Sequence, residues 1–257
     1  MTAALVDEHA RVVAALRGET PTRTTRAVGT ALTKNILDLA MTKHRDDSPI
    51  VAIGVSVAGL VDPPTRRVSM AGAKGWTRVA LRELLEEGLS NSGHDIRFGP
   101  RQKRARAELA TSAHPPITIH SHAAACASAE SWSGAARGRK DVVYLSVGNE
   151  IEAGILVGGH ALEGAGGYAG AAGWLGVGGD FKADYEARGC LSAEATMQAM
   201  TRRAIEAWSG EASTMLGGLI KADASGLNAA TILRAARGGD RLAVKVVRET
   251  CHWIGRG

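Results

Sequence analysis

The segment YLSVGNEIEAGILVGG, residues 144–159, has the pattern of two short strands around a turn flanked by glycines. Turns of this kind often bind phosphate, because glycine lets backbone N–H groups approach the oxygen atoms. This turn also carries Glu150 and Glu152. Two like charges about 4 Å apart repel by about 4 kcal/mol at an effective dielectric constant of about 20. Repulsion of this size between a carboxylate and a phosphate would lower the affinity for the phosphate roughly a thousandfold. We therefore expect no productive ATP binding at this turn, unless both carboxylates point to solvent.

Three histidines form a second group of chemically useful side chains. His120 and His122 are two residues apart, so on one strand they would share a face, and with His160 they could ligate a metal ion. Nothing in the pattern fixes a third ligand, so we predict no metal at these residues.

The cysteines indicate a reducing environment. Cys126, Cys190 and Cys251 are odd in number and far apart, which gives neither a disulfide framework nor a Cys-x-x-Cys metal pair. A cytoplasmic location follows from this reading. The first 19 residues carry several charges and do not resemble a signal peptide. No uncharged apolar run approaches the roughly 18 residues of a membrane span, so we expect no membrane partner.

The composition favours an α/β protein with glycine-rich loops. The chain has 257 residues, of which 45% are hydrophobic and 32 are glycine, while aromatic residues make up only 4%. This length suits one large domain or two small ones. The net charge of +5 is mildly basic and does not by itself indicate nucleic acid as a partner.

The first half of the chain alternates between strand and helix patterns. Residues 4–21 fit either an amphipathic helix or two strands that turn at residues 7–9, and the turn residues favour the hairpin. Residues 24–45 and 75–89 have helical periodicity, and residues 50–57 are rich in β-forming residues. Asp62-Pro63-Pro64 marks a second hairpin turn. The apolar helix faces contain Val28, Leu32, Ile36 and Leu39 in the first helix, and Leu81, Leu84 and Leu85 in the second.

Residues 91–116 contain a basic cluster and little periodicity. The cluster consists of Arg97, Arg101, Lys103, Arg104 and Arg106. It could be a phosphate-binding arm or a solvated insertion. We favour the insertion, because no aromatic residues are interleaved for base stacking.

The second half begins with a strand at residues 116–120 and a helix of small residues at 123–136. The hairpin of residues 144–159 follows, then a glycine-rich segment at 164–179. Three helices complete the pattern. The helix at 192–208 places Met197, Met200 and Ala204 on one face, the helix at 227–239 is capped by Asn228 and stopped by Gly238, and the last is capped by Asp240.

Three stretches together resemble a family of bacterial sugar kinases and sugar-responsive repressors. It is called the ROK family, after repressors, open reading frames and kinases. IGVSVAGLVDPPTRRV, residues 53–68, resembles the Gly-x-x-x-Pro-Gly-x-x-Asp strand and hairpin of that family. ITIHSHAAACASAESWSGAARGRKDVVYLSVG, residues 117–148, resembles its next strand and helix. GHALEGAGGYAGAAGWLGVGG at 159–179 with RGCLSAEA at 188–195 resembles its metal-site region. The match covers most of residues 50–195.

The resemblance implies an α/β, two-lobed fold of the actin/hexokinase-like (ribonuclease H-like) type, with nucleotide deep in a cleft and sugar beside it. We expect an N-terminal lobe at residues 1–118, with the basic insertion at about 91–116, and a C-terminal lobe at 119–257. Both lobes are expected to be incomplete. The first phosphate-binding strand of the family has no match, and the family pattern continues beyond the last residue here, so the fold is expected to be truncated at both ends.

The resemblance also implies the reaction, which is ATP- and Mg2+-dependent phosphorylation of a hexose. His122 stands in the place of the aspartate base of the family. A neutral imidazole can accept a proton, but it lacks the negative charge of that aspartate. Gly148, Asn149 and Gly154 occupy the phosphate turn, and Gly59 and Ser121 occupy sugar-binding places.

Other family positions are changed in this sequence. Ala73, Ala171 and Ser192 replace polar residues on the sugar side. The structural zinc of the family uses one histidine and three cysteines, of which only Cys190 remains. Trp174, Ala183 and Tyr185 stand at the other three places, so we expect no zinc, and we expect Trp174 to fill that space by apolar packing.

These departures predict a degenerate sugar kinase-like protein, a pseudokinase whose catalytic competence is in question. Two alternatives stay open: a non-catalytic, sugar-sensing transcriptional regulator of the same family, and a non-functional gene fragment. The winged helix of the repressor branch has no match, so we do not expect direct nucleic-acid binding. The expected partner is a small-molecule sugar. The identity of that sugar and the formation of a homo-oligomer are left open.

Overall fold

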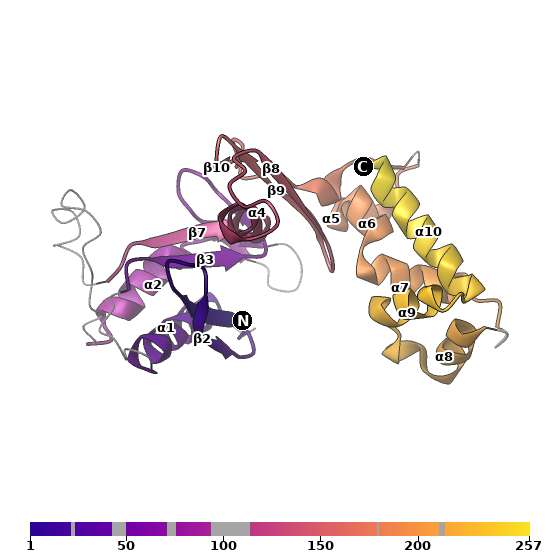
Figure 1. Cartoon of the computed structure of the whole chain (residues 1–257), viewed down its shortest axis with the longest axis horizontal. Helices are drawn as coiled ribbons and strands as arrows, with labels where there is room; N and C mark the ends of the chain where they lie inside the picture. Colours follow the sequence, from indigo (N-terminus) through magenta and orange to yellow (C-terminus); the bar gives the residue numbers. More distant parts are fainter. Residues whose placement is uncertain (22–23, 43–49, 71–75, 94–113, 179, 211–213) are drawn as a thin grey trace. The chain divides into compact units, whose positions relative to one another are not determined.

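The computed structural model describes residues 1–21, 24–42, 50–70, 76–93, 114–178, 180–210 and 214–257 (Figure 1). The chain forms two compact units. Unit 1 contains Met1–Val142 and Gly154–Ala169, and unit 2 contains Val143–Ala153 and Gly170–Gly257. Each unit has its own hydrophobic core. The expected boundary between lobes at residue 118 is not tested by this division and stays a prediction.

The N-terminal segment is a hairpin and not a helix. Strands β1 (Thr2–Val6) and β2 (Val12–Arg17) pair antiparallel. The carboxylate of Asp7 accepts hydrogen bonds from the backbone N–H groups of His9 and Arg11, at 2.8 and 2.9 Å. This local bonding, typical of aspartate in turns, confirms the hairpin prediction.

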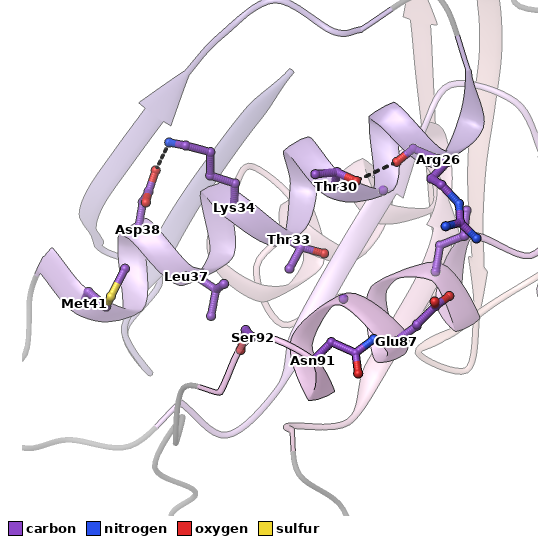
Figure 2. A pocket seen from close by; sticks show the side chains of 13 residues that line it. Arg26, Thr30, Thr33, Lys34, Leu37, Asp38, Met41, Glu87, Asn91 and Ser92 are labelled. Atoms are coloured by element: carbon purple, nitrogen blue, oxygen red, sulfur yellow. Dashed lines mark hydrogen bonds and ion pairs between the residues drawn. The ribbon is translucent and has the colours of Figure 1, made fainter.

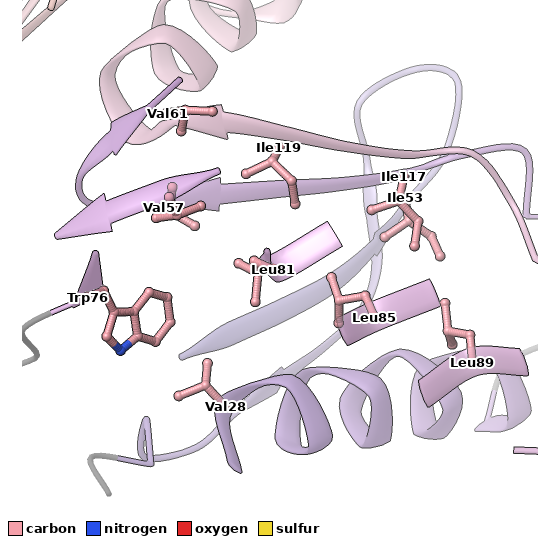
Figure 3. Packing of buried hydrophobic residues seen from close by; sticks show 11 residues of the cluster. Val28, Ile53, Val57, Val61, Trp76, Leu81, Leu85, Leu89, Ile117 and Ile119 are labelled. Carbon is pink, nitrogen blue, oxygen red and sulfur yellow. The ribbon is translucent and has the colours of Figure 1, made fainter. Parts of the chain in front are cut away.

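The core of unit 1 lies between two parallel strands and two helices. Strands β3 (Ile53–Val57) and β7 (Ile117–Ser121) pair in parallel, and helices α1 (Thr25–Thr42) and α2 (Leu81–Ser90) pack on them. Figure 3 shows the branched side chains of both strands facing the leucines of α2. Val28, Leu81, Leu85 and Leu89 are buried there, whereas Leu84 is half-buried against α1.

The predicted second hairpin is confirmed, and its continuation differs from the prediction. Strands β4 (Leu60–Val61), β5 (Val68–Met70) and β6 (Trp76–Val79) form an antiparallel sheet. Asp62 shapes the turn, because its carboxylate accepts hydrogen bonds from Thr65. Residues 76–79 were predicted as helix, which is wrong. Trp76 pairs with Met70 and is buried, so sheet pairing overrides the helical pattern there.

Helix α4 (His122–Ser133) follows β7 directly, as the sequence predicts. Strands β8 (Val142–Val147), β9 (Ile151–Val157) and β10 (His160–Ala161) come next and form a sheet in the order β10-β9-β8. The predicted hairpin of residues 144–159 is therefore present. Beyond it, the glycine-rich segment contains one short helix, η1 (Ala172–Trp174).

Unit 2 is mainly helical. Its helices are α5 (Ala183–Arg188), α6 (Cys190–Ala195), α7 (Met197–Glu206), α8 (Met215–Asp223), η2 (Ala224–Gly226), α9 (Ala229–Arg237) and α10 (Arg241–Arg256). The predicted caps are confirmed: Asn228 accepts from Thr231 N–H at 3.0 Å and Asp240 accepts from Ala243 N–H at 2.9 Å.

The prediction of a single helix at residues 192–208 is wrong, because the helix is interrupted at Thr196. The hydroxyl of Thr196 accepts a hydrogen bond from Ala199 N–H at 3.2 Å and caps a new helix, α7. Met200 and Ala204 are buried as predicted, but Met197 is 44% exposed. At the first position of α7 it lies at the edge of the core face.

The basic stretch 97–106 and Ala73 lie outside the described residues. Within the described part of the chain, no helix has both the length and the apolar character needed to cross a membrane.

Candidate functional site

The predicted sugar and base positions of unit 1 gather at one edge of its parallel strands. The register pairs Ser56 with His120 and Val57 with Ser121, so β3 and β7 end side by side. Polar groups at the carboxyl ends of parallel strands meet at one edge, the usual place for ligands in α/β folds. Gly59 follows β3 in the loop to β4, and Ser121 and His122 form the junction between β7 and α4.

His122 contacts two side chains that sequence analysis did not select. Its Nδ1 atom lies 3.2 Å from Ser56 Oγ, and its Nε2 atom lies 3.7 Å from Cys126 Sγ. His122 and Ser56 are exposed, and Cys126 is half-buried. The hydroxyl of Ser121 accepts a hydrogen bond from Ala124 N–H at 3.4 Å and so caps α4. A base with an orienting hydroxyl and a neighbouring thiol therefore lies at the end of β7.

His120 belongs to a different contact. Glu163, in the loop after β10, forms an ion pair with Arg66 and lies 3.8 Å from Nδ1 of His120. The expectation that His120 and His122 share a strand face is wrong, because β7 ends at Ser121 and His122 is already helical. Among the residues that the structure describes, no three histidine, cysteine, aspartate or glutamate residues cluster as a metal site.

The turn between β8 and β9 does not have the geometry of a phosphate cradle. Gly148 N–H donates to the carbonyl of Glu150 at 3.0 Å, and the carbonyl of Gly148 accepts from Met197 N–H at 2.9 Å. None of residues 148–154 has a positive φ. An anion nest needs consecutive N–H groups in alternating right- and left-handed conformations, so this turn does not present one. Glu150 is exposed and Glu152 is half-buried. That these residues bind no nucleotide phosphate stays a prediction.

Gly154 has a packing reason to be glycine. It lies within β9, in unit 1, and a Cβ atom there would lie 1.9 Å from the carbonyl oxygen of Ala123 and 2.8 Å from Cβ of Ala127. Gly148 is different, since its nearest atom would be Glu150 O at 3.9 Å. The close approach of β9 to α4 therefore explains one of the two glycines without any phosphate.

Asn149 borders a cavity of about 830 Å³ in unit 2. The walls come from α7 and from the N-terminal part of α9, with Met197, Ile205 and Leu233 among the apolar side chains. This volume lies within the range of small-molecule sites. Arg202, the cation in this lining, already pairs with Asp184 at 3.3 Å and Glu206 at 3.6 Å. The cavity therefore suits an uncharged group better than a phosphate.

A second hollow, of about 400 Å³, lies between α1 and α2 in unit 1 (Figure 2). None of the residues predicted to act in the site lines it. Thr33 lines this hollow, and its hydroxyl is buried without a hydrogen-bond partner among the described residues. Gly29 and Gly88, where the two helices approach closely, are among the residues that line this hollow.

Only Tyr185 among the expected zinc-ligand positions takes part in a polar network, which surrounds Glu194. Trp174 is 56% exposed, so the prediction that it fills this space is wrong. Tyr185 fills it instead: it is 7% exposed, and its hydroxyl donates to Glu194 at 2.6 Å. Lys182 also donates to Glu194, and Arg203 does so at 3.3 Å. The Cys190 thiol lies 3.3 Å from Val177 N–H. These residues do not form a zinc-ligand set, and the absence of bound zinc stays a prediction.

Burial alone would raise the pKa of Glu194, which is 4% exposed. Hydrogen bonds from Lys182 and Tyr185, together with the charge of Arg203, outweigh burial and hold the pKa of Glu194 below its ordinary value. The hydrogen bond to Glu194 raises the pKa of Lys182, and burial followed by the same contact raises the pKa of Tyr185. The network thus favours an ionised Glu194.

Sequence reasoning missed Ser56, Cys126, Glu163 and Glu194. One signal was visible: His122 directly precedes the helix predicted at 123–136 and is four residues from Cys126, a spacing that places both on one face if the helix begins at His122. The other contacts depend on strand pairing and loop placement between distant segments, and the sequence pattern does not contain that information.

Comparison with known proteins identifies relatives. The model of the ROK family matches residues 96–257. A glucokinase from Halalkalibacterium halodurans is 26% identical over 235 residues, covering 88% of this chain and 63% of that protein. The chain therefore spans less than two thirds of the length of that relative.

Two solved structures share the fold. A ROK family glucokinase from Streptomyces griseus, in complex with glucose and AMPPNP, has a TM-score of 0.71 at 24% identity, with 99% of this chain and 73% of that chain covered. A ROK family transcriptional regulator, a homologue of the E. coli MLC protein, has a TM-score of 0.78 at 20% identity, with 99% and 57% covered. The α/β fold of actin/hexokinase-like sugar kinases, predicted from the sequence, is confirmed.

Proposed function

The chain belongs to the ROK family, and we propose that it is a sugar kinase-like protein that binds a small-molecule ligand without transferring phosphate. The observation that carries this proposal is the closed turn at residues 148–150. Its Gly148 N–H is already bonded to Glu150 O, and its backbone lacks the left-handed residue of an anion nest. The ligand is a sugar by lineage, and the location is the cytoplasm.

The replacement of the base supports the same proposal. His122 is bonded to Ser56 through Nδ1 and contacts Cys126 through Nε2. Both ring nitrogens are therefore directed at protein groups. A neutral imidazole also lacks the carboxylate charge that positions a sugar hydroxyl beside a metal ion in phosphoryl transfer. Phosphoryl transfer would need both the turn and the base, and each is altered.

The test is a hexose phosphorylation assay with Mg2+ and ATP, run beside the H. halodurans glucokinase as a positive control. We expect no product above background from this chain, and no ATP binding by calorimetry in the millimolar range. ATP binding at micromolar concentration together with turnover of any hexose would contradict the proposal. A sugar panel in a thermal-shift assay tests the ligand separately, and a reproducible rise in melting temperature with one sugar supports it.

A sugar-sensing regulator is the second candidate. It is favoured by the TM-score of 0.78 with a ROK family transcriptional regulator, compared with 0.71 for the glucokinase. The two candidates differ in their readout. Binding of a sugar that changes association with a protein or with operator DNA supports the regulator, whereas a sugar response without such a change favours a simple binding protein.

A further inference from the structure

We propose that Cys126 is a reactive thiol, activated by His122 and Ser56, that forms a mixed disulfide with low-molecular-weight disulfides. The three side chains come from two elements of unit 1, Ser56 from β3 and the other two from the first turns of α4 (Figure 1). The contacts run in a line from hydroxyl to imidazole to thiol. This inference does not depend on the proposed function, because it needs neither sugar nor nucleotide.

The geometry has the order that an activated nucleophile requires. His122 Nε2 lies 3.7 Å from Cys126 Sγ, within hydrogen-bond range for sulfur, and the two residues lie one turn apart on α4. Ser56 Oγ lies 3.2 Å from Nδ1, on the other side of the same ring. A nucleophile beside a base, with the base held by a third group, is the arrangement of activated thiols.

Ser56 suits every state of the imidazole. A hydroxyl both donates and accepts, so it can accept from Nδ1–H when Nε2 is free to take the thiol proton. It keeps the same contact after the imidazole becomes protonated, when both ring N–H groups donate, one to Ser56 and one to the sulfur. We therefore assign Ser56 as a positioning residue for His122.

Access to the thiol is also present. Cys126 is half-buried, whereas His122 and Ser56 beside it are exposed, so a small molecule can reach the group from the side of the imidazole. Reactive cysteines are found in such partly exposed places next to a basic side chain.

The reaction balances without any further oxidant. Nε2 of His122 accepts the proton of the Cys126 thiol, and the sulfur attacks one sulfur atom of a disulfide R–S–S–R. A new S–S bond forms at Cys126 while the original S–S bond breaks. The electron pair of that bond leaves on the second sulfur, which takes up the proton from His122 and departs as a free thiol. Cys126 is oxidised and the released sulfur is reduced.

The other two cysteines serve as internal controls. Cys251 is exposed on α10, and its thiol forms no hydrogen bond in the part of the chain that the structure describes. Cys190 is half-buried, and its sulfur lies 3.3 Å from Val177 N–H. If exposure alone decided reactivity, Cys251 would react first. If the imidazole decides it, Cys126 reacts first.

The experiment uses the reduced full chain and 2-hydroxyethyl disulfide, a small uncharged probe, at pH 7. Peptide mass spectrometry measures the rate of mixed-disulfide formation at each cysteine. We expect Cys126 to react about tenfold faster than Cys251, and His122→Gln to bring its rate to that of Cys251 or below. Ser56→Ala should lower the rate a fewfold, and Ser56→Thr, which keeps the hydroxyl, should restore it.

Two outcomes overturn the proposal: a Cys126 rate no higher than that of Cys251, or a Cys126 rate unchanged by His122→Gln. The rate at Cys190 reports on folding, since unfolding would raise it. If His122→Gln raises the Cys190 rate, the comparison of Ser56→Ala with Ser56→Thr decides, and equal rates in those two variants count against the proposal.

Discussion

Glu194 concentrates several interactions of unit 2 on one buried carboxylate. Its side chain accepts from Tyr185, Lys182 and Arg203, and Arg203 also donates to the Glu194 carbonyl at 2.7 Å and to Thr250 at 2.9 Å. The contacts connect α5, α6, α7 and α10. A charge this deeply buried is costly unless its oxygen atoms are bonded, and here they are.

The pKa of Glu194 gives this network a pH dependence. Because the pKa in the folded chain lies below the ordinary value of 4.5, ionised Glu194 stabilises the fold above that value. This stabilisation is lost as the pH falls through the folded pKa. The free energy of unfolding should therefore decrease in acid below about pH 4.5, in part because of this residue.

We predict that Glu194→Gln lowers the free energy of unfolding at pH 7 by about 2–4 kcal/mol, since it removes a bonded, buried charge. The difference from the unaltered chain should shrink as the pH falls below 4.5 toward the lowered pKa of Glu194, because the carboxylate becomes protonated there. Urea unfolding at pH 7 and at acidic pH measures both values. Glu186→Gln, at an exposed position on α5, is the matched control and should change little. A difference that does not depend on pH would contradict the assignment.

The residues that the sequence predicted correctly act over short distances. Asp62 bonds to Thr65, Asn228 to Thr231 and Asp240 to Ala243, so each role can be derived from a few neighbouring letters. Ser56 and His122 are 66 residues apart, and Glu194 meets partners 9 to 12 residues away, beyond the ends of its own helix. Such contacts follow from the fold and cannot be derived from local pattern.

At the scale of elements, β9 and α4 approach too closely for any side chain at Gly154. We predict that Gly154→Ala destabilises the chain by on the order of 3 kcal/mol, because the clashing atoms belong to backbone and to a buried helix. Thermal unfolding measures the loss. Gly148→Ala is the control from the same predicted phosphate turn and should stay within about 1 kcal/mol. Equal effects would mean that the packing does not distinguish these two glycines.

Helices α1 and α2 also approach each other closely, where Thr33 faces Gly88. A Cβ atom at Gly88 would lie 2.5 Å from Thr33 Oγ1, and Thr33 is buried and branched at Cβ. We predict that Gly88→Ala lowers the free energy of unfolding by about 1–2 kcal/mol, even though alanine favours helix by about 1 kcal/mol. Adding Thr33→Ala should recover much of the loss, because it removes the clashing atoms and a hydroxyl without a partner.

Gly218 on α8 provides the comparison for Gly88. Apart from its chain neighbours and the backbone of its own helix, no described atom lies within 4 Å of a Cβ atom at this position, so Gly218→Ala should be neutral or stabilising by up to about 1 kcal/mol. Chemical unfolding of the two alanine variants separates helix propensity from steric overlap. A Gly88→Ala variant as stable as Gly218→Ala would show that α1 and α2 can separate at little cost.

Helices and strands were predicted correctly where a periodic hydrophobic pattern continues over many residues. They were missed where strand pairing or a side-chain cap competes with that pattern. Helix α1 follows its apolar stripe over 18 residues. Strand β6 has only four residues, and its conformation is fixed by pairing with β5. The strand was missed because residues 75–89 have a continuous helical periodicity. The break before α7 comes from the side chain of Thr196, whose cap outweighs a continuous helical pattern.

At the scale of the whole molecule, the described residues form three hydrophobic clusters, one in unit 1 and two in unit 2. Leu85 belongs to the cluster between β3, β7 and α2, whereas Ile232 belongs to the helical cluster of α7, α8, α9 and α10. Both side chains have 0% exposure. The chain passes between the units three times, at residues 142–143 in β8, at 153–154 in β9 and at 169–170. Each unit is therefore expected to have its own local stability, even though β8 and β9 each contain residues of both units.

We predict that Leu85→Ala and Ile232→Ala each cost about 2–5 kcal/mol, but in different parts of the chain. Truncating a buried leucine or isoleucine removes contacts only within its own cluster, and regions with separate cores open with separate free energies. Native-state hydrogen exchange followed by mass spectrometry measures this by peptide. Leu85→Ala should speed exchange in β3, β7 and α2 while α9 and α10 stay protected, and Ile232→Ala should do the reverse. Equal loss of protection in both units with either variant would instead mean that the chain unfolds as one cooperative block.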